Sequence, residues 1–144
     1  MTPTVQVADI CLLVALTALI VHWVVERRRL RRFVQRFGDL PADPRRAALE
    51  IAGQLFVRPR RDDDPPYLTK ALAPLGSTAG DVIEVGGCCS GTSRLYILCL
   101  AQLGIRAHQI TVYHRRGYAQ HCLVEAVLRD GPLIADPCYG LYYT

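Results

Sequence analysis

The sequence predicts an α+β protein that begins with a membrane-anchoring helix, and three observations lead to this prediction. Residues 7–25 form an apolar run with few polar interruptions. Apolar positions at helical spacing then fill residues 92–103, and a helix-ending glycine follows them. Three β-rich stretches come after that helix, at residues 107–113, 121–128 and 133–136. We therefore expect one buried helix packed on a small antiparallel sheet.

The apolar run is long enough to cross a lipid bilayer. Its nineteen residues would form a helix of about 28 Å, close to the roughly 30 Å thickness of the hydrocarbon layer. Because no basic residue precedes the run and no small-x-small cleavage pattern follows it, we expect a single anchor rather than a signal peptide. The alternative is a helix packed in an oligomer or against a partner protein, which three polar residues favour: Gln6, Asp9 and His22.

The chain has a formal charge of +4, and the arginines responsible cluster directly after the apolar run. By the positive-inside rule, this arrangement places the N-terminus outside and the folded part in the cytoplasm. A reducing compartment predicts free thiols for most of the six cysteines, whereas the opposite topology would favour a bridge between Cys122 and Cys138. We expect no nucleic-acid partner, because the chain carries no recognisable nucleic-acid motif. The cluster consists of Arg27, Arg28, Arg29, Arg31, Arg32 and Arg36.

Three regions are predicted along the chain. Residues 1–26 form the transmembrane anchor, residues 27–80 a helical juxtamembrane region with a linker, and residues 81–144 the folded core. The first turns of the middle region read as a basic amphipathic helix, residues 27–37, which we expect along the membrane surface.

The rest of the middle region is predicted to hold two more helices and a linker. Asp43 and the proline after it are typical of an N-cap and a first helical turn, which opens a helix to about Val57. Prolines and charges of both signs make residues 58–66 a linker. A short helix is expected at residues 67–75.

The last third of the chain supplies the parts of a cysteine-based catalytic site in the order Cys89, His121, Asp136. A thiol nucleophile, an imidazole base and a carboxylate that orients the base are what acyl transfer requires. At the start of a buried helix, the positive end of the helix dipole favours the thiolate, and free N–H groups can hold an oxyanion. Gly86 and Gly87 before it allow a tight turn.

These segments resemble the transglutaminase-like superfamily, with its papain-like Cys-His-Asp core, over residues 85–143. The matching features are a cysteine that opens a helix, the exit Gly104-Ile105-Arg106-Ala107-His108, the pattern His121-x-x-x-Glu125, and Asp136-Pro137. The resemblance implies a nucleophile fifteen residues before the helix-ending glycine, which is Cys89 and not Cys88. Arg106 and His108 stand where the family has proline and arginine, which leaves the subfamily open.

The resemblance implies a small membrane-anchored thiol enzyme. Such an enzyme hydrolyses or transfers an amide or other acyl group through a cysteine thioester, as a hydrolase, an acyltransferase or a cysteine protease. Its substrate would be a protein, a peptide or a small acyl compound, and it would need no cofactor and no metal. A noncatalytic anchored module for binding or assembly is the alternative, and the stretch from Asp136 to Gly140 also resembles arylamine N-acetyltransferases.

Several residue assignments stay open in the sequence. A two-residue turn at 130–131 would set Asp136 opposite Glu125, so the triad needs a bulge, a strand twist or a wider turn, or Glu125 orients the base instead. His114 is an alternative base if the strand register differs. Ligands for zinc could come from Cys88, Cys89, His121 and Cys138, but adjacent cysteines lack the usual ligand separation.

Overall fold

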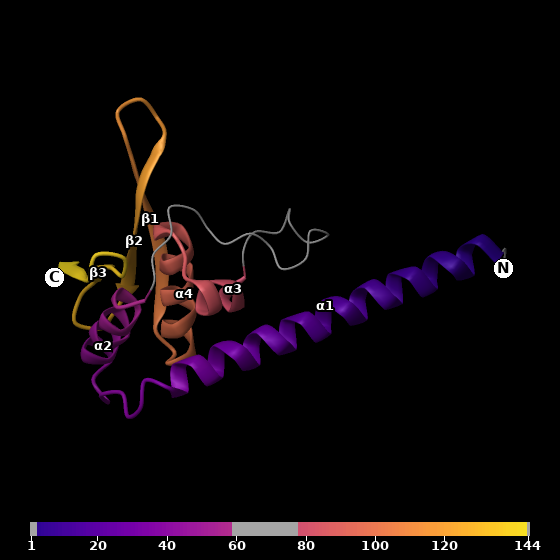
Figure 1. Cartoon of the computed structure of the whole chain (residues 1–144), viewed down its shortest axis with the longest axis horizontal. Coiled ribbons are helices and arrows are strands. Elements are labelled where there is room, and N and C mark those ends of the chain that lie inside the picture. The colour runs from indigo at the N-terminus through magenta and orange to yellow at the C-terminus, as the bar shows by residue number, and fades with distance from the viewer. Residues whose placement is uncertain (1–2, 59–77, 144) are drawn as a thin grey trace.

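The computed structural model describes residues 3–58 and 78–143 and has the predicted α+β architecture (Figure 1). The described helices are α1 (Pro3–Gln35), α2 (Pro44–Phe56), α3 (Ala79–Val85) and α4 (Cys89–Gln102). The strands are β1 (Arg106–Tyr113), β2 (Ala119–Val127), β3 (Leu133–Asp136) and β4 (Leu141–Tyr143). They form one antiparallel sheet in the order β1-β2-β3-β4, and α4 packs against β1 and β2.

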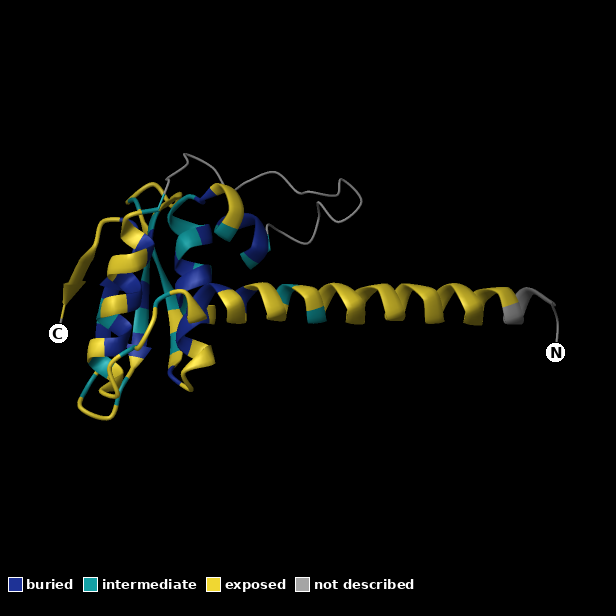
Figure 2. Ribbon diagram, turned by 60° about the horizontal axis from the view of Figure 1, so that its bottom comes forward, coloured by how far each residue is buried: buried dark blue, intermediate teal, exposed yellow. Residues whose placement is uncertain are grey.

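The N-terminal part of α1 projects away from the folded domain (Figure 1). Its apolar side chains lie exposed along most of the helix (Figure 2), as Leu12 illustrates at 70% exposure. The segment from Val7 is long and apolar enough to cross a membrane. The domain does not cover these side chains, so this part of α1 presents a long apolar surface of the kind that a membrane or a partner protein covers.

The C-terminal part of α1 enters the core of the domain. Leu30, Phe33 and Val34 are buried together with residues of α2, α4 and the sheet, while the arginines beside them stay exposed. The expectation that this amphipathic segment lies along the membrane surface is therefore wrong. The helix runs from the apolar segment into the domain without a break, and its apolar face packs against protein instead of lipid.

The junction between α1 and the domain is fixed by a hydrogen bond. The backbone N–H of Gly80, at the start of α3, donates to Oε2 of Glu26 at 2.8 Å. The hydrophobic core also includes Ile51 of α2 and Val82 of α3, so it extends across residue 81, the predicted start of the core region.

Helix α2 begins as its sequence predicts. The side chain of Asp43 accepts hydrogen bonds from the backbone N–H groups of Arg45 and Arg46, and Pro44 occupies the first helical position. The buried Tyr96 hydroxyl of α4 donates to the carbonyl of Ala48 at 3.0 Å, which ties α2 to the central helix. The linker predicted at residues 58–66 and the helix predicted at 67–75 lie almost wholly outside the described residues.

The three predicted strands are confirmed to within two residues at their ends, whereas α3 and β4 were not predicted. Glycine is required in the turn between β3 and β4, where Gly140 has a φ of +65°. A Cβ atom at Gly140 would also lie 3.0 Å from Cγ of Phe56.

Replacing Gly140 with alanine should therefore destabilise the protein by about 2 kcal/mol, about half from the backbone and half from the contact with Phe56. The matched control is Gly104→Ala, because Gly104 has a φ of +72° but nothing within 4 Å of the added Cβ. We expect a loss of about 1 kcal/mol for the control. Urea unfolding of both variants measures the difference, and equal losses would contradict the contact with Phe56.

Candidate active site

The structure joins His121 of β2 to Asp136 at the end of β3. Nε2 of His121 lies 2.6 Å from Oδ2 of Asp136, and the two side chains are 23% and 5% exposed. A turn wider than two residues makes this contact possible, because Glu125 pairs with Ile134 and Val124 with Ala135. Continuing this register places Asp136 diagonally across from His121, within reach of its ring.

Asp136 is held in place by two further hydrogen bonds. Its Oδ1 accepts from the backbone N–H of Cys138 at 3.0 Å and from that of Tyr139 at 3.1 Å. The ring of Tyr139 also packs against the imidazole of His121, with 5.2 Å between the ring centroids. With both carboxylate oxygens engaged, Asp136 accepts the Nε2–H of His121 and leaves Nδ1 as the basic nitrogen.

The alternative base and the alternative orienting acid are engaged elsewhere. Glu125 lies 2.9 Å from Nε2 of His108, its direct partner across β1 and β2. The ring of His114 stacks on Tyr118 in the hairpin turn, with centroids 4.7 Å apart. Glu125 therefore orients His108, and His114 belongs to the tip of the hairpin.

A contact between distant segments holds the turn that sets this register. Nε of Arg45, at the start of α2, donates to Oδ2 of Asp130 at 2.7 Å, and Nη2 donates to the carbonyl of Gly131 at 3.1 Å. The pKa of the Asp130 carboxyl lies below its usual value because of the hydrogen bond from Arg45. The sequence offered no signal for this contact, which spans 85 residues.

Cys89 is the first residue of α4, as the sequence predicts, and Cys88 is its N-cap. Gly86, which ends α3, has a φ of +84° that favours glycine. Gly87 is packed tightly, because a Cβ atom there would lie 3.1 Å from Cγ1 of Val82. The two glycines thus allow the chain to turn from α3 into α4 and present Cys89 at the helix start.

The Cys89 thiol lies beside Cys122, the residue after His121 in β2. Within the described residues, its hydrogen bonds are with Cys122 and with the backbone N–H of Ser90, and His121 is not among its partners. Ser93, one turn further along α4, donates its hydroxyl to the carbonyl of Cys122 at 3.4 Å. Alternation along β2 turns Cys122 toward α4 and His121 away from it.

The environment of Cys89 favours the thiol over the thiolate. Burial raises the pKa of the Cys89 thiol, and the neighbouring Cys122 thiol raises it further, while backbone N–H groups of Cys122 and Ser90 lower it. The expected thiolate at the helix N-terminus is thus not the resting form at neutral pH, because desolvation outweighs the N–H groups.

Alkylation of Cys89 by iodoacetamide should consequently be slow at neutral pH and accelerate as the pH rises through the raised pKa. Cys122→Ala removes the neighbouring thiol but keeps the backbone N–H, so the midpoint of the pH profile should move down. Cys11→Ala, which removes an exposed thiol in the anchor, is the control. Quantitative peptide mapping measures both profiles, and an unchanged midpoint in Cys122→Ala would contradict the contact between the thiols.

The described residues form no group of three or more His, Cys, Asp or Glu side chains that could hold a metal ion. The six cysteines all lie in the described residues, and none forms a disulfide, so Cys122 and Cys138 are not bridged. Comparisons with protein-family models, with curated proteins and with solved structures found no match to this chain. The geometry of the site is therefore the basis for a functional assignment.

Proposed function

We propose that the protein is a membrane-anchored thiol enzyme of the transglutaminase-like kind, which hydrolyses or transfers an acyl group through a thioester on Cys89. The observation that carries this proposal is the bond between Asp136 and Nε2 of His121, one residue from the strand position against which the Cys89 thiol lies. A histidine held by a buried carboxylate through one ring nitrogen is arranged as a general base through the other.

The chemistry requires the start of α4 and β2 to shift, so that the Cys89 thiol leaves Cys122 and meets Nδ1 of His121. Nδ1 takes the thiol proton as the sulfur attacks the carbonyl carbon of the substrate, and Asp136 stabilises the imidazolium that forms. The oxyanion of the tetrahedral intermediate is held by N–H groups at the start of α4, among which that of Ser90 already faces the sulfur.

Collapse of the intermediate breaks the acyl bond and completes acylation. The leaving amine takes the proton from His121, and the acyl group stays on Cys89 as a thioester. Water, activated by Nδ1 of His121, then attacks the thioester and releases the acid. An amine or alcohol in place of water gives acyl transfer.

Residues 7–25 anchor the enzyme in a membrane, with the folded domain in the cytoplasm. Support for this orientation comes from the exposed arginines that directly follow the apolar run. Because α1 enters the core without a linker, the catalytic domain is held close to the lipid surface.

The test is acylation of the full chain in detergent with an activated acyl thioester. We expect one adduct on Cys89, sensitive to hydroxylamine, found by intact mass measurement and peptide mapping. Cys88 is the control within the same molecule, because it is adjacent and similarly exposed. Equal modification of Cys88 and Cys89 would contradict a catalytic role for Cys89.

A noncatalytic binding or assembly module is the second candidate, and the resting state of Cys89 favours it. A thiol that faces Cys122 and has a raised pKa suits a structural position. This reading predicts that Cys89→Ser leaves the stability and partner binding of the anchored protein intact, and that the acylation experiment yields no adduct.

A further inference from the structure

The hairpin of β1 and β2 extends well beyond the rest of the sheet (Figure 1). The two strands have eight and nine residues, whereas β3 has four and pairs only with the part of β2 from Val124 onward. At the far end, Tyr113 and Tyr118 are 63% and 56% exposed. His121 lies at the foot of this extension, so the hairpin projects from the candidate active site.

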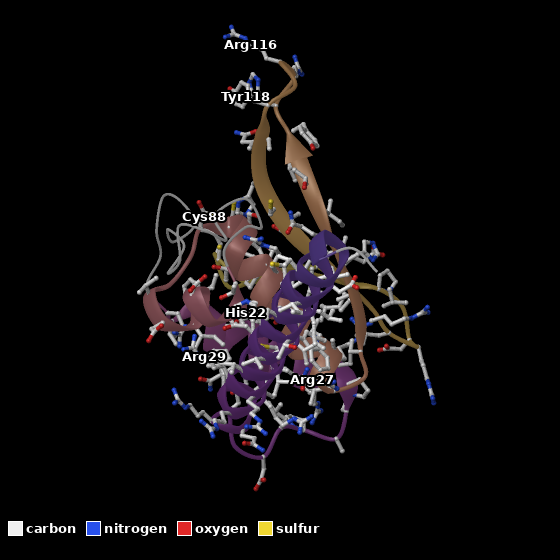
Figure 3. All side chains as sticks on the ribbon, turned by 90° about the vertical axis from the view of Figure 1, so that its right-hand side faces the viewer. His22, Arg27, Arg29, Cys88, Arg116 and Tyr118 are labelled. Atoms are coloured by element: carbon white, nitrogen blue, oxygen red, sulfur yellow. The ribbon has the colours of Figure 1, made fainter. Side chains whose placement is uncertain are left out.

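The outer part of the hairpin is basic. Residues 106–124 contain no Asp or Glu, and Arg115 and Arg116 at the tip are both exposed. Figure 3 shows Arg116 and Tyr118 together at the outer end, with Cys88 near the base of the hairpin. The positive charge therefore lies at the tip, and the strands between the tip and His121 carry no acidic side chain to oppose it.

The tip is built as a fixed turn. The N–H of His114 donates to the carbonyl of Tyr118 at 2.9 Å, and the N–H of Gly117 donates to the carbonyl of His114 at 2.8 Å. The N–H of Arg116 donates to Nδ1 of His114 at 3.2 Å. The stack of His114 on Tyr118 adds to this order, so the backbone that presents the two arginines is ordered before binding.

We propose that this hairpin is a docking arm that recognises an acidic segment of a polypeptide substrate. That the bound polypeptide is a substrate rests on the function proposed above, whereas binding of an acidic segment to the hairpin does not depend on that function. The four steps along the chain from Gly117 to His121 span about 13 Å at 3.3 Å each, so the acidic residues of an extended peptide lie about four to five residues from the reacting carbonyl. Arg115 and Arg116 bind the carboxylates of the peptide, and Tyr113 and Tyr118 contact the peptide chain between its acidic residues.

Two other classes of partner fit the hairpin less well. The hairpin projects to one side of α1 (Figure 1), and two arginines at about 1 kcal/mol each would hold it only weakly on a lipid surface. The two arginines at the tip can neutralise about two phosphates of a nucleic acid, which gives only weak binding at physiological salt.

The experiment measures peptide binding to the full chain carrying Cys89→Ala, in detergent, by fluorescence anisotropy. The probes are a labelled extended peptide with four glutamates, the same peptide with four glutamines, and a single-stranded RNA of equal length. The variant is Arg115→Gln with Arg116→Gln. The matched control is Arg31→Gln with Arg32→Gln, which removes the same charge from two exposed arginines of α1.

We expect the glutamate peptide to bind about tenfold more tightly than the glutamine peptide, with the difference lost in the hairpin variant and kept in the control. Equal binding of the two peptides, or equal loss in both variants, would overturn the proposal. Tighter binding of the RNA that is lost in the hairpin variant would also overturn it. The binding experiment measures no turnover, so it tests the hairpin alone. The acylation experiment tests the reactivity of Cys89, and failure of one proposal can be told from failure of the other.

Discussion

Replacing His121 with alanine is expected to slow acylation of Cys89 by about two to four orders of magnitude, the usual contribution of a positioned general base. The effect should be large here because burial and Cys122 raise the pKa of the Cys89 thiol, so little thiolate forms without a base. The measurement is the rate of adduct formation at Cys89 with the activated acyl thioester, followed by mass spectrometry at fixed pH.

His114→Ala is the matched control, because this ring stacks on Tyr118 in the hairpin turn and does not contact the site. We expect its acylation rate to stay within about twofold of the unmodified protein. Circular dichroism of both variants separates a lost base from a lost fold. An unchanged rate in His121→Ala would falsify the assignment of His121 as the base.

The order and type of the elements around the site could be predicted from local sequence, because each has a local cause. β-rich composition on both sides of a turn predicts β2 and β3, and helical spacing before Gly104 predicts α4. The bond between His121 and Asp136 is less local. It depends on the width of the turn after β2, and Arg45 holds that turn from 85 residues away, so the sequence left Glu125 as an alternative.

The environment of a segment is harder to predict than its conformation. The segment that holds Leu30 and Phe33 has an apolar face and a basic face, which suits a membrane surface and a protein core equally well. The state of Cys89 is a similar case. Its place at a helix start predicts a thiolate, but the burial and the neighbouring thiol that oppose it arise only from packing.

The two missed elements differ in what the sequence could reveal. Helix α3 carries a signal, because Thr78 and Asp81 form a capping box in which each side chain accepts from the backbone N–H of the other. Strand β4 has three residues, all exposed, so its sequence lacks the alternation that marks a strand. It forms because the turn at Gly140 returns the chain alongside β3.

Asp136→Asn is expected to lower the acylation rate of Cys89 by about a thousandfold while leaving the fold intact. The asparagine oxygen can still accept from the N–H groups of Cys138 and Tyr139, which fixes the amide nitrogen toward His121. Two donors then face each other at 2.6 Å unless the proton of His121 moves from Nε2 to Nδ1. In that tautomer, Nδ1 can no longer take the thiol proton.

The tautomer provides a readout that a structural role would not change. Nitrogen-15 NMR of His121 should show Nε2–H in the unmodified protein and Nδ1–H in Asp136→Asn. Asp39→Asn is the control, because it makes the same change at an exposed carboxylate in the segment between α1 and α2. Asp136→Ala differs from both, since it also removes the acceptor for two backbone N–H groups and should cost about 2 kcal/mol of stability. A slow Asp136→Asn variant that keeps the original tautomer would mean that Asp136 acts by positioning the ring and not by fixing its proton.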